Sequence, residues 1–216
     1  MRLDHLAYVS DHDHVVDVVQ RLGSSLGAAF IDGGIHPRFG TRNFILPLDG
    51  GMYLEIVCAL DHPAADQLPF GRAVTRRAAE GGGWLGWVVG LDDITVAEKR
   101  LGRESAPGHR RRPDGVDLSW KQLGINNMIE DPQLPFFIEW NVDESEHPSA
   151  GSKSGVRIER LEIAGDPTVV CQWLGEPEEH PLDDVAVTWL DPSDNDGATG
   201  LVAVEFRTPK GLVRID

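Results

Sequence analysis

The sequence predicts an α+β fold in which two βαβββ modules are followed by a third, partial βαβ-type module at the C-terminus. A strand-like segment, an aspartate and an amphipathic run ending in Leu-Gly occur together three times along the chain. Three later segments each carry one glutamate inside an apolar run. The size is compatible with this fold, because 216 residues, 41% of them hydrophobic, can fill one large domain or two small fused units.

The first repeated feature opens each of the three units. The strand-like segments are Leu3-Asp4-His5-Leu6-Ala7-Tyr8-Val9, Leu85-Gly86-Trp87-Val88-Val89 and residues 156–163. They lead to Asp11, Asp92 and Asp166, and the amphipathic runs end at Leu22-Gly23, Leu101-Gly102 and Leu174-Gly175. Aspartate is typical of a helix N-cap and glycine of the residue that ends a helix, so each copy predicts a strand followed by a helix.

The second repeated feature closes each unit. The glutamate-bearing strands are Tyr53-Leu54-Glu55-Ile56-Val57, Phe137-Ile138-Glu139-Trp140 and Ala203-Val204-Glu205-Phe206. Short alternating runs separated by polar, glycine-rich turns precede them, which indicates about three antiparallel strands after each helix. One such unit leaves a sheet face half-buried, so the modules are expected to pack together.

Breaks in these patterns give the boundaries. One domain is predicted over residues 1–143, made of modules at about 1–62 and 83–143, and the C-terminal module at 155–216 is predicted to pack on it. The connector 63–82 contains a predicted helix at 70–80 before Gly81-Gly82-Gly83, and residues 143–155 are predicted to form a loop.

The charge balance restricts the partners. The formal net charge of −15 disfavours phosphate backbones and anionic lipid surfaces, so neither nucleic acid nor a membrane is expected as a partner. The one basic cluster, Arg110-Arg111-Arg112, precedes the turn sequence Pro113-Asp114-Gly115 and is assigned to a solvated hairpin. The expected partner is a small-molecule ligand, and a homodimer is left open.

Cysteine usage and the N-terminal sequence bear on the compartment. Two cysteines, Cys58 and Cys171, provide no disulfide framework, and the first residues run directly into a strand without a basic-then-apolar leader. No apolar stretch approaches the roughly 18 residues of a membrane span. We therefore expect a cytoplasmic protein.

Strand alternation places two chemically active side chains on one face. If Leu6 and Leu54 face the helices, His5 and Glu55 both face the other way, because neighbouring residues of a strand point to opposite sides. Imidazole and carboxylate together can hold a divalent metal. The alternatives are a surface His5 and a Glu55 paired with Arg42. Recurrence of the glutamate at Glu139 favours the metal or acid-base interpretation, since buried carboxylates are rare unless paired or ligating.

These residues carry a family resemblance that covers essentially the whole chain. The register of His5 and Glu55, with the segments His36-Pro37-Arg38-Phe39-Gly40-Thr41-Arg42-Asn43 and Leu134-Pro135-Phe136-Phe137-Ile138-Glu139-Trp140, resembles the vicinal oxygen chelate superfamily. The similarity is to its glyoxalase-like domain branch, of the glyoxalase/bleomycin resistance/dioxygenase type. The resemblance implies metal ligands at His5, Glu55, Gly86 and Glu139.

Gly86 departs from that pattern, because glycine offers no side-chain ligand. The resemblance then implies a weakly held divalent ion (Mn, Mg, Fe or Zn) on His5, Glu55 and Glu139, or no metal, and no other cofactor. It also makes ring-cleaving dioxygenase activity less expected, since the two-histidine, one-carboxylate iron triad is lacking.

The same alternation argument predicts the rest of the pocket. The side chains expected to line it are Asn43, Ile45, Trp84, Trp120, Gln122, Phe137 and Asn141. Trp87 and Trp140 are expected on the helix side, and His147, which precedes a proline, is assigned to a turn or the surface. An apolar wall with a few convergent polar groups is typical of a small-ligand site.

Two functions remain open from the sequence. The first is a lyase or isomerase of the glyoxalase-like type, in which Glu139 or Glu55 is the catalytic base and a metal ion stabilises enolate charge. The second is a non-catalytic binding protein of the drug-sequestering type. Gly86 favours the second, whereas the presence of His5, Glu55 and Glu139 favours the first.

Overall fold

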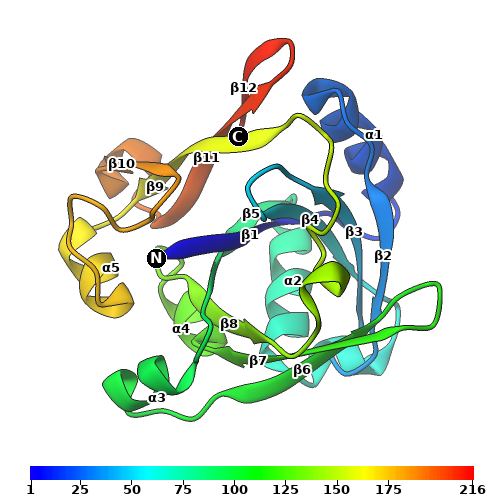
Figure 1. The fold of residues 1–216 in the computed structure, drawn as a ribbon, viewed down its shortest axis with the longest axis horizontal. Coiled ribbons are helices and arrows are strands. Elements are labelled where there is room, and N and C mark those ends of the chain that lie inside the picture. The colour runs from blue at the N-terminus through cyan, green and yellow to red at the C-terminus, as the bar shows by residue number, and fades with distance from the viewer.

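A computed structural model describes residues 1–216 and contains both predicted βαβββ modules (Figure 1). Module one consists of β1 (Arg2–Val9), α1 (Val15–Leu26), β2 (Ile31–His36), β3 (Thr41–Pro47) and β4 (Tyr53–Ala59). Module two consists of β5 (Gly83–Gly90), α3 (Thr95–Leu101), β6 (Ala106–Arg111), β7 (Asp117–Leu123) and β8 (Phe136–Trp140), with α4 (Ile125–Glu130) inserted before β8. In each module the first strand pairs in parallel with the last one.

The two modules close into one barrel with the strand order β1-β4-β3-β2-β6-β7-β8-β5. One joint is extensive, because β1 pairs antiparallel with β5 along most of its length. The other joint is short, since β2 and β6 pair only at Ile35 and Arg111. Gly34, with φ 98°, permits this close approach, because a Cβ at that position would collide with the Arg111 carbonyl oxygen.

The connector between the modules covers part of the barrel. It contains the 3₁₀ helix η1 (Pro63–Asp66) and α2 (Pro69–Ala79), which matches the helix predicted at 70–80. Phe70 and Val74 of α2 belong to the apolar cluster of the barrel interior. The later connector contains the 3₁₀ helix η2 (Glu144–Glu146) and is otherwise loop.

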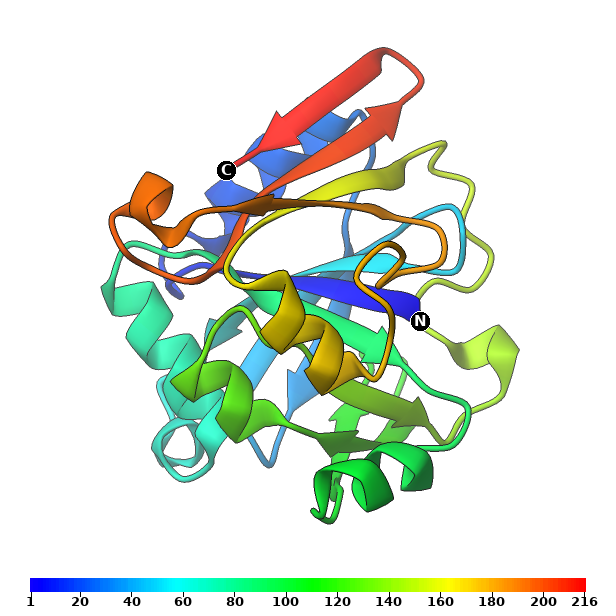
Figure 2. The same cartoon turned by 90° about the vertical axis from the view of Figure 1, so that its left-hand side faces the viewer.

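The C-terminal unit forms a separate sheet, visible beside the barrel in Figure 2. Its elements are β9 (Arg157–Ala164), α5 (Pro167–Leu174), β10 (Ala186–Leu190), the 3₁₀ helix η3 (Pro192–Asn195), β11 (Gly200–Thr208) and β12 (Gly211–Ile215). β10 lies parallel to β9, so β9, α5 and β10 form the predicted βαβ unit. Unlike in the modules, the strand that follows the helix lies beside the first strand. Glu205 on β11 pairs with Arg160 across the sheet, with Oε2 3.2 Å from Arg160 Nε.

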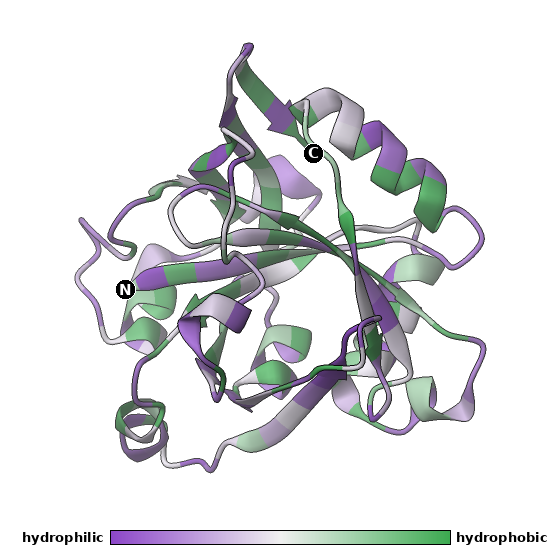
Figure 3. Cartoon of the chain, turned by 45° about the vertical axis from the view of Figure 1, so that its right-hand side comes forward, coloured by the Kyte–Doolittle hydropathy of each residue, from purple (hydrophilic) through white to green (hydrophobic).

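One apolar core joins the outer face of the barrel to the C-terminal sheet. It includes Leu6 and Leu54 of the barrel together with Leu161 and Phe206 of the sheet, all essentially inaccessible to solvent. Hydrophobic and hydrophilic residues alternate along α1 (Figure 3), and the helix buries Val15, Leu22 and Leu26. α1 runs one turn past the predicted end at Leu22-Gly23, because Leu26 is also buried, and Gly27 ends it in the left-handed conformation. None of the helices is long and apolar enough to cross a membrane.

Candidate active site inside the barrel

A small cavity lies inside the barrel, between the two modules. Its volume is about 30 Å³, enough for one water molecule or one small chemical group. The lining residues are His5, His36, Phe39, Asn43, Tyr53, Glu55, Phe70, Arg110, Trp120, Gln122, Phe136, Ile138 and Trp140. The cavity is thus an aromatic chamber with a few convergent polar groups.

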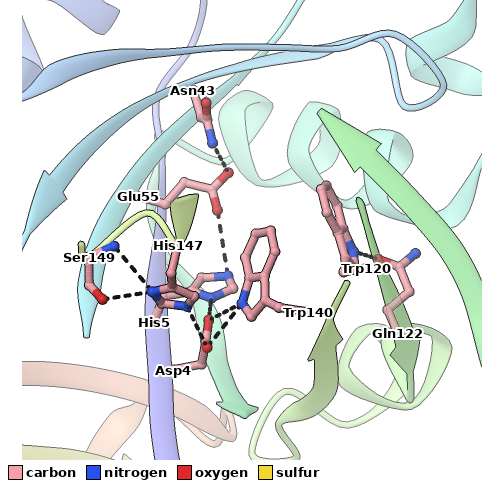
Figure 4. Close-up of polar contacts among 9 residues, drawn as sticks. All are labelled: Asp4, His5, Asn43, Glu55, Trp120, Gln122, Trp140, His147 and Ser149. Carbon is pink, nitrogen blue, oxygen red and sulfur yellow. Dashed lines mark hydrogen bonds and ion pairs between the residues drawn. The ribbon is translucent and has the colours of Figure 1, made fainter. Parts of the chain in front are cut away.

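His5 and Glu55 meet in this cavity, as the alternation of β1 and β4 requires. The parallel register sets His5 beside Tyr53 and Ala7 beside Glu55, so the side chains of His5 and Glu55 both lie on the inner face. His5 Nε2 is 3.6 Å from Glu55 Oε2 (Figure 4). The imidazole also stacks on the Tyr53 ring, with 4.4 Å between centroids. Asn43 Nδ2 donates to Glu55 Oε1 at 3.2 Å, which fixes the carboxylate.

A buried aspartate orients His5 from behind. His5 Nδ1 donates to Asp4 Oδ1 at 2.7 Å, and Asp4 is completely inaccessible to solvent. Asp4 Oδ2 also accepts from Trp140 Nε1 and from His147 Nε2, each at 3.2 Å (Figure 4). Because Nδ1 of His5 is bound to Asp4, Nε2 is the ring nitrogen that faces Glu55 in the cavity.

The carboxyl group of Asp4 stays ionised in this setting. Burial alone would raise its pKa, but hydrogen bonds from His147 and His5 outweigh burial and hold the pKa well below 3.8. The His147 tautomer fits, since its Nδ1 accepts from the Ser149 backbone N–H at 3.2 Å and leaves Nε2 to donate to Asp4. An ionised, buried carboxylate thus fixes the orientation of the His5 and His147 rings.

Two other polar residues of the cavity remain uncharged. Burial, followed by the nearby Arg110, places the pKa of His36 well below 6.5, and His36 Nδ1 is 2.9 Å from Thr41 Oγ1. Burial, followed by the charges of Asp4 and Glu55, raises the pKa of Tyr53 well above 10, so its hydroxyl keeps its proton. Trp120 Nε1 donates to Gln122 Oε1 at 2.9 Å, which leaves the Gln122 amide hydrogens available to a ligand.

An outer cleft of about 210 Å³ adjoins the chamber. Phe39, Phe70 and Gln122 line both spaces, so they form the neck between them. Arg38, Arg103 and Glu104 lie at the wall of the cleft. A ligand of ordinary size would therefore occupy the cleft and extend one end into the chamber.

Comparison with known proteins identifies the family. The model of a family described as "Glyoxalase-like domain" matches residues 3–178. The chain belongs to this family. Its residues 3–178 include both barrel modules and continue through α5 of the C-terminal unit.

Several solved structures also align with this chain. A hypothetical protein from Staphylococcus aureus aligns with a TM-score of 0.72 at 15% identity, covering 100% of this chain and 98% of that one. Methylmalonyl-CoA epimerase from Mycobacterium tuberculosis aligns with a TM-score of 0.41 at 14% identity, covering 64% and 86%. A variant of the Streptomyces coelicolor epimerase, in complex with 2-nitronate-propionyl-CoA, aligns with a TM-score of 0.42 at 16% identity, covering 65% and 93%. No curated protein sequence matches the chain.

The second predicted glutamate of this glyoxalase-like domain lies outside the chamber, which corrects its assignment as base and metal ligand. Glu139 Oε2 accepts from the Ile94 backbone N–H at 2.7 Å, and Oε1 is 2.9 Å from Lys121 Nζ. The inner face of β8 carries Phe136, Ile138 and Trp140 instead. The repeat had suggested that Glu139, like Glu55, faces the inside of the barrel. In the structure the outer face of β8 is covered by the C-terminal unit, and Phe137 packs on that face together with Glu139.

The same register corrects three further residues of β8. Phe137 packs outside the barrel against Trp173, with 5.8 Å between ring centroids. Asn141 lies beyond the strand end and is exposed. Trp140, expected on the helix side, lines the chamber and donates to Asp4.

Trp84 is also corrected, and for a related reason. It packs outside the barrel on Tyr8, and its Nε1 donates to the Ile215 carbonyl of the C-terminal sheet at 3.2 Å. A bulge between Ala7 and Tyr8 in the β1–β5 pairing shifts the alternation at this point, so Trp84 and Trp87 both face outward. Trp120, Gln122 and Asn43 do line the chamber, whereas Ile45 is buried on the same strand without lining it.

The donor set does not fit the metal site implied by the family. Gly86 faces Met128, and Glu139 points away, so only His5 and Glu55 of the four implied positions reach the chamber. No group of three or more His, Cys, Asp or Glu side chains is arranged to hold a metal ion. Arg42 does not neutralise Glu55 either, since its Nη2 pairs with Asp32 Oδ2 at 2.6 Å outside the barrel.

The predicted pocket left out several polar residues of this site, among them Asp4, His36, His147 and Arg110. Alternation along β6 could have found Arg110. Its position two residues after Gly108 places it on the inner face of the hairpin, whereas Arg111 is exposed. Asp4 gave no such signal, because alternation turns it away from the cavity that it serves through His5 and His147.

Proposed function

We propose that this glyoxalase-like domain is a small-molecule isomerase or lyase in which Glu55 removes a proton from a carbon next to a carbonyl group. The observation that supports the proposal is the chain of contacts from buried Asp4 through His5 to Glu55, which ends in the chamber. A positioned carboxylate can act as a general base, and a neighbouring imidazole held by an aspartate can accept and return protons.

The step balances within these groups. Glu55 Oε2 takes the proton, and the electron pair of the C–H bond forms an enolate. The Tyr53 hydroxyl and the Gln122 amide are neutral donors on the chamber wall that can stabilise the enolate oxygen. In an isomerase the proton returns to carbon at the other face or the neighbouring position, and in a lyase a leaving group departs with the electron pair. His5 Nε2 is placed to take the proton from Glu55 and return it.

A weakly held divalent ion was the expected cofactor, and it would find only His5 and Glu55 as protein ligands here. Proton transfer is therefore assigned to Glu55 and His5. Exchange that is lost with a chelator and restored by manganese would contradict this assignment and support the ion.

The test is exchange of C–H for C–D in deuterium oxide, followed by proton NMR on a panel of small carbonyl compounds that includes pyruvate, 2-oxobutyrate, pyruvamide and hydroxyacetone. Glu55→Gln should lower the exchange rate at least 100-fold, the lower end of the general-base effect of about 10² to 10⁴. Glu139→Gln is the matched control and should leave the rate unchanged. Equal loss in both variants, or no exchange by the wild-type protein on any compound, would refute the proposal.

Non-catalytic binding is the second candidate, and the aromatic lining of the chamber favours it. A compound that binds with micromolar affinity to wild-type protein and to Glu55→Gln, without exchange in either, would support binding without turnover.

A further inference from the structure

Arg110 is the only lysine or arginine side chain that is buried in the protein. It lies on β6, is 4% exposed and faces the chamber, while its neighbour Arg111 points to solvent. Arg112, the third residue of the basic cluster, pairs outside with Asp114 and Glu146. The structure therefore corrects the assignment of the whole cluster to a solvated hairpin.

The guanidinium of Arg110 has almost no partner within the protein. Its Nε makes no hydrogen bond, and its only side-chain hydrogen bond is from Nη1 to Asn43 Oδ1 at 3.5 Å, the limit for such a bond. No carboxylate lies within 4.0 Å of it. A buried charge is costly unless it is paired, so this group is suited to an anion supplied from outside.

Glu55 is not that partner, because other groups hold it. Asn43 lies between the two side chains, donating from Nδ2 to Glu55 Oε1 and accepting from Arg110 at Oδ1. Burial lowers the pKa of Arg110, but a guanidinium remains charged in proteins. The chamber thus contains a carboxylate that can accept a proton, Glu55, and a guanidinium that can bind an anion, Arg110, with the Asn43 amide between them.

The approach to the chamber has the same preference. The protein carries a net charge of −15, yet Arg38 and Arg103 line the outer cleft without a carboxylate partner. Arg38 Nη1 donates to the Pro107 carbonyl at 3.0 Å, and Arg103 donates to Asn127 Oδ1. Glu104 is the one acidic residue of that lining. Arginines at a mouth raise the local concentration of anionic ligands.

We propose that the ligand of this site is a small organic acid whose carboxylate group binds Arg110 inside the barrel. Guanidinium and carboxylate match in a bidentate geometry, and the planar carboxylate is compatible with a chamber of about 30 Å³. The rest of the molecule lies through the neck toward the cleft. The inference rests on the proposed function in that it names the substrate class of the same chamber, with the reacting carbon held between Arg110 and Glu55.

The binding test compares acids with their neutral analogues. Pyruvate, 2-oxobutyrate and lactate are titrated against their amides, with the fluorescence of Trp120 and Trp140 as the signal, since both indoles line the chamber. Wild-type protein should bind each acid at least tenfold more tightly than the amide, which is about 1.4 kcal/mol. Arg110→Gln should remove this preference, and the neighbouring exposed Arg111→Gln should keep it.

A second measurement does not depend on finding the ligand. Removing an unpaired buried charge relieves its desolvation cost, so ligand-free Arg110→Met should unfold at a higher urea concentration than the wild-type protein. Arg111→Met should not. A lower midpoint for Arg110→Met would show that the guanidinium is stabilised within the protein, and it would overturn the inference.

The outcomes separate the inference from the proposed function. Acid preference that depends on Arg110, with no deuterium exchange on any acid, supports the inference and refutes the proton transfer. Exchange that depends on Glu55 but proceeds equally on acids and amides refutes the inference alone. Failure of every acid to bind, or equal binding to Arg110→Gln, also overturns it.

Discussion

Replacing Asp4 by asparagine should destabilise the protein through the loss of one buried charge. Asp4 accepts hydrogen bonds from His5, Trp140 and His147, and none of its surface is exposed. Hydrogen bonds to a charged acceptor contribute about 1.5 to 3 kcal/mol each. The asparagine oxygen can retain one or two of these, but its amide group would then face a donor. We therefore expect the free energy of unfolding to fall by about 3 kcal/mol.

Urea denaturation followed by far-ultraviolet circular dichroism measures this loss without depending on Trp140 fluorescence. With a urea m-value of about 3 kcal/mol/M for a chain of this size, the midpoint should fall by roughly 1 M. The matched control is Asp11→Asn. Asp11 Oδ1 is 2.8 Å from His14 Nδ1, a similar pair in solvent, and an asparagine oxygen can still accept from the backbone N–H groups of Asp13 and His14 in this turn. Equal midpoints for the two variants would refute the argument.

The same variant predicts a change in acid stability. The pKa of Asp4 is lowered in the folded protein, so its contribution is fully present above the unfolded value near 3.8 and is lost as the pH falls toward the folded value. The wild-type midpoint should therefore decline below about pH 4, and the decline should be smaller in Asp4→Asn. An identical decline in both would show that other carboxylates cause it.

Two further predictions test the assignments outside the chamber. Glu139→Ala should lower the free energy of unfolding by about 1 kcal/mol in urea titrations, because the Ile94 N–H at the start of α3 loses its acceptor. Glu139→Gln keeps an acceptor and should lose less, and a larger loss for this variant would contradict the role. Removal of residues 155–216 should leave a fragment that aggregates in size-exclusion chromatography, since Trp84 and Phe137 lose the covering sheet and helix; a monodisperse, folded fragment would show that the C-terminal unit is an independent appendage.

The repeats in the sequence were sufficient to predict the two modules, but they did not predict for every strand which side chains face the inside of the barrel. Alternation placed His5 and Glu55 together because β1 and β4 are regular where they pair. It failed for Trp84, where a bulge shifts the register. It also failed for Glu139, because its similarity to Glu55 was used to orient the strand, whereas the buried Phe137 on the outer face decides the orientation. The C-terminal unit covers that face, and nothing local to β8 reveals it.

Polar partners in space were the other gap. Asp4 and His147 are separated by 143 positions and meet only because the loop after β8 folds back onto β1. Arg110 looked like one member of a surface cluster, since charge patterns along a chain do not tell which member of a strand faces inward. Applying alternation to charged as well as apolar residues would have separated it from Arg111.

The unequal joints of the barrel have a mechanical consequence. At one joint β1 and β5 pair along their length, whereas at the other β2 and β6 pair only at Ile35 and Arg111. Gly34 allows this second contact because it has no Cβ. Asn43 and Glu55 belong to module one, and Arg110 belongs to module two, next to Arg111 of the short joint. A ligand that binds Arg110 and the residues of module one would connect the two modules across the short joint. Such a ligand would therefore stabilise the closed barrel at the place where strand pairing contributes least.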